Sequence, residues 1–131
     1  MKNAVVQLPV EPGLAQALDC AGVHVIIDVW KAKNLTDPKF IDQVFRKAAE
    51  SAGATVLHSH FHHFTPDQGV SGVLVLAESH MSIHTWPDRG YASIDIYMCG
   101  RCNPRDALPV LRSAFGGELT ETVLNRGLAT D

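Results

Sequence analysis

A polar cluster follows directly after an apolar run in the middle of the chain. The run GVLVLA, residues 72–77, leads straight into Glu78, Ser79 and His80, and a second histidine, His84, comes five residues after the serine. Serine, histidine and carboxylate side chains are the groups that nucleophilic and acid–base catalysis use. A strand that ends in such a cluster favours a catalytic site.

Two common enzyme classes fit this cluster poorly. A serine hydrolase with a nucleophile elbow needs glycine two residues before and two residues after the serine, whereas Ala77 and Met81 occupy these positions around Ser79. A pyridoxal-phosphate enzyme needs a larger scaffold and a Schiff-base lysine, and the lysines lie in the N-terminal third of the chain or just beyond it, away from the cluster. Another reaction must use the serine.

One remaining reaction suits a serine that follows an acidic residue at a strand junction. The hydroxyl of Ser79 attacks the preceding carbonyl, the Glu78-Ser79 amide becomes an ester, and elimination then cleaves the chain. After loss of ammonia the new N-terminus is a pyruvoyl group. Its ketone can form a Schiff base with a substrate amine and accept the electrons left by departing carbon dioxide.

A histidine-rich segment, HSHFHHF at residues 58–64, offers metal chemistry instead. In a strand His58, His60 and His62 share one face, and three imidazoles can bind zinc. Because no carboxylate or cysteine stands nearby as a fourth ligand or orienting group, we favour a polar strand face and predict no metal site.

The three cysteines offer redox chemistry. Cys99 and Cys102 form a C-x-x-C motif, which is typical of thioredoxin-like exchange when it begins a helix, and a zinc ribbon would need a second such pair. With Cys20 the count is odd, which argues for free thiols in a reducing compartment. We therefore interpret Cys102 as an ordinary thiol near a strand end, and we assign no role to Cys20.

The elements that must position these groups follow from the spacing of apolar residues. Alternation predicts a strand over 23–30, and a spacing of three and four predicts a helix that Asp37 caps, Pro38 begins and Gly53 stops. A second helix is predicted over 103–117, where the internal Pro109 kinks it or divides it into two short pieces. The remaining strands are predicted at residues 54–64, 70–77, 79–86, 91–98 and 118–125.

This order predicts an α/β (α+β) fold, a two-layer sandwich with a mostly antiparallel sheet and two helices on one face. The 131 residues fit a single domain, 1–131. Residues 1–20 lack clean periodicity and contain two prolines and a glycine, so we expect a loose N-terminal arm.

Charge and hydropathy exclude some partners. The formal net charge is -3 and the 11 lysines and arginines are scattered, which argues against nucleic acid. No apolar run is long enough to span a bilayer and the N-terminus lacks the apolar core of a signal peptide. We expect a cytoplasmic protein.

A longer pattern carries a resemblance. The segment ESHMSIHTWPDRGYASIDIYMCG, with GVSGVLVLA before it and HFHHF further upstream, closely resembles the core of the prokaryotic S-adenosylmethionine decarboxylase proenzymes, over roughly His24 to Cys102. The resemblance implies a two-layer α/β sandwich, a homodimer of self-cleaved protomers with two alpha and two beta chains, and a pyruvoyl cofactor derived from Ser79. It also implies decarboxylation of S-adenosylmethionine for polyamine (spermidine) synthesis.

The resemblance also implies roles in processing and catalysis. Ser79 resembles the self-cleaving serine, so that the beta chain ends at Glu78, and Ser71 and His84 resemble the pair that assists processing. Cys99 resembles the acid that protonates the substrate's α carbon, and an ordinary thiol is mostly protonated at neutral pH, as this requires. Because a straight strand places Ser79 and His84 on opposite faces, we expect a bend at the cleavage point, or action of His84 across a neighbouring strand or protomer.

The implied substrate contacts are Phe64, Met81, Trp86 and Asp88. Phe64 resembles the aromatic residue that stacks on adenine, and Asp88 stands where the family usually has the glutamate that holds the ribose hydroxyls. Aspartate is one methylene shorter, so its contact with a diol needs a shifted backbone or a bridging water.

Two rival functions remain at this point. The same scaffold can decarboxylate another amino acid, ornithine or arginine. An unprocessed paralogue would keep the fold but only bind or regulate, and it would stay one polypeptide. The joint presence of Ser71, Ser79, His84 and Cys99 favours the enzyme.

Overall fold

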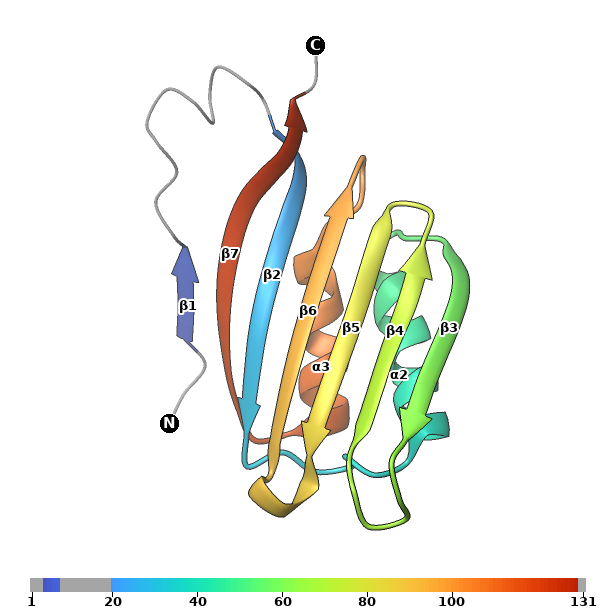
Figure 1. Cartoon of the computed structure of the whole chain (residues 1–131). Helices are drawn as coiled ribbons and strands as arrows, with labels where there is room; N and C mark the ends of the chain where they lie inside the picture. The colour runs from blue at the N-terminus through green and yellow to red at the C-terminus, as the bar shows by residue number, and fades with distance from the viewer. Residues whose placement is uncertain (1–3, 8–19, 130–131) are drawn as a thin grey trace.

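The computed structural model describes residues 4–7 and 20–129, which form one sheet and two helices (Figure 1). The helices are α2 (Pro38–Ser51) and α3 (Leu108–Phe115), with single 3₁₀ turns η1 (Pro87–Arg89) and η2 (Pro104–Ala107). The strands are β1 (Ala4–Gln7), β2 (Cys20–Trp30), β3 (Val56–His63), β4 (Val70–Leu76), β5 (Ser79–Trp86), β6 (Tyr91–Cys99) and β7 (Glu118–Ala129).

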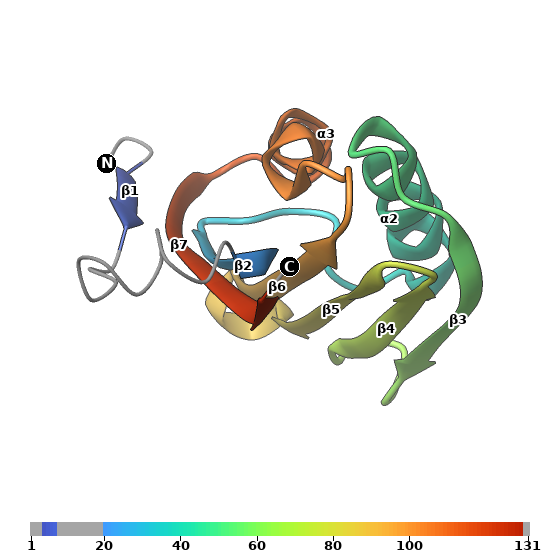
Figure 2. The same cartoon turned by 90° about the horizontal axis from the view of Figure 1, so that it is seen from above.

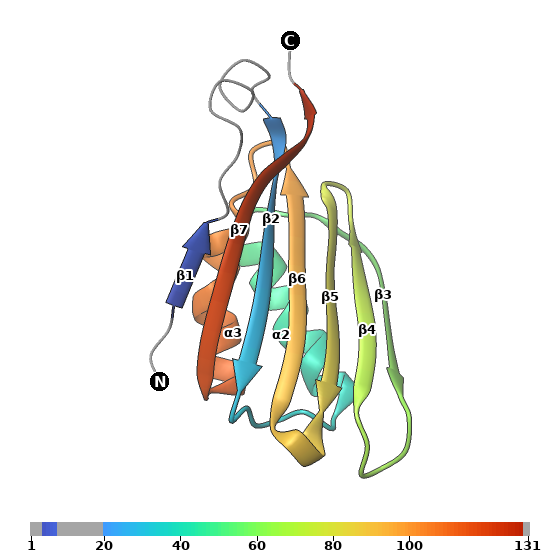
Figure 3. The same cartoon turned by 60° about the vertical axis from the view of Figure 1, so that its left-hand side comes forward.

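The sheet has the order β1-β7-β2-β6-β5-β4-β3. All neighbouring strands are antiparallel except β1 and β7, which are parallel. Both α2 and α3 cover the same face (Figure 2 and Figure 3), and we call the opposite face of the sheet the open face. The predicted two-layer sandwich is confirmed.

Helix α2 forms for the local reasons that the sequence indicates. The Asp37 carboxylate accepts a hydrogen bond from the Lys39 N–H at 3.0 Å, and Pro38 occupies the first turn, where a missing N–H costs nothing. Its apolar side packs Ile41 and Phe45, both fully buried, against the sheet. Burial of each such side chain stabilises the fold by about 1.5–3 kcal/mol.

The second predicted helix is divided, as Pro109 indicates. The first piece is η2, in which the Asn103 side chain accepts a hydrogen bond from the Arg105 N–H. The second piece is α3, and Pro109 lies in its first turn, where it removes no helical hydrogen bond.

The expectation of a loose arm over residues 1–20 is wrong in two places. Residues 4–7 form β1, which pairs with β7 from Ala4 opposite Thr120 to Gln7 opposite Val123, and Cys20 is the first residue of β2. A strand of four residues is too short to show a period, and its partner lies more than 100 residues away in sequence. Residues 8–19 lie outside the described part.

Strand alternation divides the central strands between the two faces. On β5, Met81 and Ile83 are fully buried under the helices, while His84 and Trp86 are exposed on the open face. None of the helices in the described ranges is long and apolar enough to cross a bilayer.

Candidate active site

The Glu78-Ser79 bond lies in the tight turn between β4 and β5. Leu76 and Ser79 form the last pair of the hairpin, so Ala77 and Glu78 make up the turn. The Ala77 N–H donates to the Thr55 carbonyl oxygen at 2.9 Å, which ties the turn to the start of β3. The turn is therefore fixed by a neighbouring segment as well as by its own hairpin.

The Glu78 carbonyl is held by two donors from the end of β6. The Cys99 N–H lies 3.1 Å from the Glu78 carbonyl oxygen, and the Cys99 thiol donates to the same oxygen at 3.2 Å. Attack on this carbonyl would place negative charge on its oxygen, and donors that are already in position stabilise such charge. This is an oxyanion-hole arrangement around the predicted cleavage point.

The Glu78 carboxylate is also fixed. Thr55 donates its N–H to Glu78 Oε1 at 2.9 Å and its hydroxyl to Oε2 at 3.3 Å. Both sides of the residue before the cleavage point are therefore held, the carbonyl by Cys99 and the side chain by Thr55.

Ser79 has an unusual backbone conformation, with φ of 143°. Residues with a side chain rarely adopt such an angle, and the cost is about 1–3 kcal/mol. The strain falls on the residue whose amide bond would rearrange, so it destabilises the intact peptide at this position.

The implied processing pair lies at the other end of the same strands. Ser71 on β4 is directly opposite His84 on β5, and Ser71 Oγ lies 2.8 Å from His84 Nδ1. If the imidazole carries its proton on Nδ1 and donates it to Ser71, Nε2 is free to accept a proton. This is the arrangement of a positioned general base.

Next to this pair is a pocket of about 510 Å³. This volume is within the range of small-molecule sites. Phe64 and Trp86 bring apolar rings that are 55% and 45% exposed, and the side chain of Asp88 is 80% exposed. The residues that line it are Phe64, Asp67, Gln68, Gly69, Ser71, His84, Thr85, Trp86, Pro87 and Asp88.

The inner wall of the pocket is held by Thr85. Its hydroxyl accepts from the Val70 N–H and donates to the Leu35 carbonyl oxygen, each at 2.8 Å. A Cβ on Gly69 would lie 2.0 Å from the Thr85 carbonyl oxygen, so only glycine fits where the β3–β4 loop approaches β5.

The expected substrate contact at Met81 needs correction. Its side chain is completely buried in the core under the helices, since the strand alternation that exposes His84 and Trp86 turns Met81 the other way. We therefore leave Met81 out of the proposed pocket and retain Trp86.

The two groups of residues do not meet within one chain. Strand β5 pairs in continuous register with β4 from Ser79 to His84 and with β6 from Ser79 to Trp86. At roughly 3.3 Å per residue, Ser79 and His84 are about 16 Å apart along the strand. The expected bend near the cleavage point does not bring the histidine to the serine.

Comparison with known proteins assigns the chain to a family. The S-adenosylmethionine decarboxylase family matches residues 23–127 of the chain. The chain belongs to this family.

Individual relatives agree with this assignment. The S-adenosylmethionine decarboxylase proenzyme of Anoxybacillus flavithermus is 43% identical over 114 residues, covering 85% of this chain and 91% of the relative. Proenzyme 2 of Halalkalibacterium halodurans is 46% identical over 115 residues, 85% of this chain and 90% of the relative. The crystal structure of the adenosylmethionine decarboxylase from Aquifex aeolicus superposes with a TM-score of 0.76 at 29% identity, over 86% and 95% of the two chains. The resemblance found in the sequence is confirmed.

Sequence reasoning missed Thr55. The residue stands before a predicted strand and belongs to no motif, so nothing local marks it as part of a site. Its contacts with Ala77 and Glu78 arise because β3 lies beside β4 at the sheet edge.

Cys99 and Cys102 are free thiols in different settings. Cys99 donates to the Glu78 carbonyl, whereas the Cys102 thiol donates to the Gly53 carbonyl oxygen at 3.4 Å. Burial raises the pKa of the Cys102 thiol, and the nearby Glu78 and Cys99 raise it further. A protonated, poorly nucleophilic Cys102 agrees with the prediction of an ordinary thiol.

Proposed function

We propose that this chain is a self-processing decarboxylase that converts S-adenosylmethionine into its decarboxylated form and carbon dioxide. The product would supply aminopropyl groups for polyamine synthesis, including spermidine, in the cytoplasm. The observation that carries the proposal is the pair of Cys99 donors on the Glu78 carbonyl oxygen, next to the strained Ser79. Family membership supports the substrate.

The first step is the rearrangement of one peptide bond. Ser79 Oγ forms a bond to the Glu78 carbonyl carbon, the charge on the oxygen is stabilised by the Cys99 N–H and thiol, and the carbon–nitrogen bond breaks to give an ester and a free amine. A base then removes the Ser79 α proton, the bond between Ser79 Cβ and the ester oxygen breaks, and the beta chain leaves with a C-terminal α-carboxylate on Glu78. Water converts the remaining enamine into a ketone and ammonia.

We assign the base for the elimination to His84 of a second copy of the chain. His84, held by Ser71, has the geometry of a base but lies about 16 Å along β5 from its own Ser79. A homodimer that brings the pocket end of one protomer to the cleavage point of the other provides both halves. The processed dimer then contains two alpha and two beta chains.

The residues around Ser79 fit a pyruvoyl group formed there. When formed, its ketone supplies the electron sink for decarboxylation. The Cys99 thiol already lies against the Glu78 carbonyl, so it is positioned to deliver a proton to a substrate carbon at the same place. Phe64 and Trp86 would stack on the adenine, and Asp88 would accept hydrogen bonds from the ribose hydroxyls.

Mass spectrometry of the purified protein tests the processing. We expect two fragments, 1–78 and 79–131, the second with a blocked N-terminus. A Ser79→Ala variant should stay intact, whereas a Ser51→Ala control at the exposed end of α2 should be cleaved normally. An uncleaved, unmodified Ser79 in active protein would overturn the proposal.

Carbon dioxide release tests the substrate. We expect release from S-adenosylmethionine and none from ornithine or arginine. Release only from one of these amino acids by cleaved protein would contradict the substrate assignment and leave the processing chemistry intact.

A further inference from the structure

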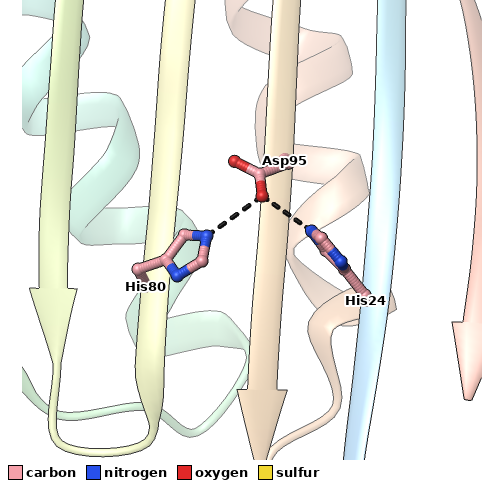
Figure 4. Close-up of side chains that lie close together, drawn as sticks. All are labelled: His24, His80 and Asp95. Carbon is pink, nitrogen blue, oxygen red and sulfur yellow. Dashed lines mark hydrogen bonds and ion pairs between the residues drawn. The ribbon is translucent and has the colours of Figure 1, made fainter. Parts of the chain in front are cut away.

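A separate cluster of metal-ligating side chains lies in the middle of the open face. His24 Nε2 is 2.7 Å from Asp95 Oδ2, and His80 Nε2 is 3.0 Å from the same oxygen (Figure 4). The three side chains come from β2, β5 and β6, which are adjacent strands. His80 directly follows Ser79 in β5, but none of the three side chains is assigned a role in the cleavage or in the pocket.

The strand register explains why these groups converge. His80 and His24 both lie opposite Tyr97, one on each side of β6, and Asp95 is two residues before Tyr97 on the same face. Three hydrogen-bonded strands therefore set the spacing, and no flexible loop is involved. The Tyr97 ring packs against both imidazoles, at centroid distances of 5.3 and 6.2 Å.

We propose that His24, His80 and Asp95 bind one divalent transition-metal ion of the zinc or cobalt class. Their ligand atoms all lie within 4.8 Å of one another. Bonds of about 2.0–2.1 Å in a tetrahedral site separate neighbouring ligand atoms by about 3.3 Å. The two imidazole nitrogens, at 2.7 and 3.0 Å from Asp95 Oδ2, would therefore move slightly away from that oxygen and toward each other.

The surroundings suit such an ion. The Ser82 hydroxyl donates to Asp95 Oδ1, which orients the carboxylate and leaves Oδ2 toward the imidazoles. The side chains are 20% to 40% exposed, which leaves room for a water as fourth ligand.

The histidine-rich strand β3 lacks this convergence. His58, His60 and His62 are exposed on the open face, as expected, but successive members are roughly 6.6 Å apart along one strand. Within the described ranges, His24, His80 and Asp95 form the one group whose ligand atoms meet. The strand with the most histidines, β3, is therefore not where the metal-ligating atoms converge.

Metal titration of the purified full-length chain, freed of metal with a chelator, tests this proposal. We expect calorimetry with Zn²⁺ to give one tight site per chain, and Co²⁺ to give the visible absorption of a tetrahedral ion. The double variant His24→Gln/His80→Gln should weaken Zn²⁺ binding at least about 100-fold. Asp95→Asn should weaken it as well, since a neutral amide is a poor zinc ligand.

The matched control removes two histidines from β3. A His58→Gln/His60→Gln variant should keep the affinity, stoichiometry and Co²⁺ spectrum of the unaltered chain. Loss of binding in this control, unchanged binding in the His24/His80 variant, or no binding to the unaltered chain would each overturn the proposal. Circular dichroism shows whether each variant is folded, and the Asp95→Asn chain provides a second test if the double variant is not. The proposal does not depend on decarboxylase activity.

Discussion

The two ends of the central strands differ in what their side chains do: at one end they hydrogen-bond to the chain itself, and at the other they surround a pocket. At the end with the β4–β5 turn, Thr55 holds the side chain of Glu78 and Cys99 holds its carbonyl oxygen, through hydrogen bonds of 2.9 to 3.3 Å. At the other end, Phe64, Trp86 and Asp88 expose side chains around a pocket. The first end thus fixes the residue before the proposed cleavage point, and the second forms the pocket in which we propose that the substrate binds.

This difference follows from antiparallel connectivity. The turn between β4 and β5 lies at one end of the sheet, and the β3–β4 and β5–β6 connections lie at the other (Figure 1). Residues close together in sequence, such as Ser79 and His84, are thereby placed about 16 Å apart. Proximity in sequence is a poor guide to which residues share a site.

Co-expression of two inactive variants tests most directly whether Ser79 of one copy and His84 of another form one processing site. Expressed alone, Ser79→Ala lacks the nucleophile and His84→Ala lacks the base, so we expect neither chain to be cleaved. Co-expressed with distinguishable tags, the His84→Ala chain should be cleaved, because a Ser79→Ala partner supplies an intact His84. Fragment masses identify the cleaved chain. Cleavage of His84→Ala alone, or none in the mixture, would contradict a site shared between two copies.

Removing the Cys99 thiol should affect the cleavage end strongly. We expect Cys99→Ala to slow fragment formation by about 10- to 100-fold, since one of two donors to the developing oxyanion is lost and the backbone N–H remains. The rate is measured by the appearance of fragment 79–131 in freshly made protein. Cys102→Ala should process at the normal rate, because its thiol contacts the Gly53 carbonyl instead. Equal rates in both variants would remove Cys99 from the mechanism.

Changing Asp88 should affect the pocket end alone. We expect Asp88→Ala to be cleaved normally and to raise the KM for S-adenosylmethionine about tenfold, the effect of losing a charged hydrogen-bond acceptor. Steady-state kinetics measure the KM. Asp88→Glu, which keeps a carboxylate, should have a KM close to that of the unaltered chain. Asp106→Ala, at an exposed position on η2, is the control. Slower cleavage of Asp88→Ala would show that the two ends are not separable.

Removing the Thr55 hydroxyl should have the smallest effect. Thr55→Val keeps the N–H bond to Glu78 and loses only the 3.3 Å hydroxyl bond, so we expect cleavage to slow severalfold, for a loss of about 1 kcal/mol. The same fragment assay measures it, with Thr36→Val as control. If Thr55→Val is cleaved as fast as the unaltered chain, the Thr55 hydroxyl makes no contribution to holding the Glu78 side chain for cleavage.

Much of the fold and part of the site could be predicted from local patterns. Capping by Asp37 and Pro38 marks the start of α2, and Pro109 correctly divides the second helix. A turn at residues 77–78 also places Ser71 opposite His84, since positions equally far from a hairpin turn pair with each other. The family motif then supplied roles for residues whose types alone are ambiguous.

Amino-acid order by itself determined both helices, all strands except β1, the faces of these elements and the residues able to do chemistry, because periodicity, capping and turn formation depend on neighbours a few residues apart. Tertiary structure alone decided that Thr55 and Cys99 hold Glu78, that Met81 is buried, and that β1 pairs with β7. It also decided that His24 and Asp95, 71 residues apart in sequence, share a hydrogen bond. Such contacts depend on which strands lie side by side, and the order of strands in a sheet is set by packing of the whole core rather than by any local pattern.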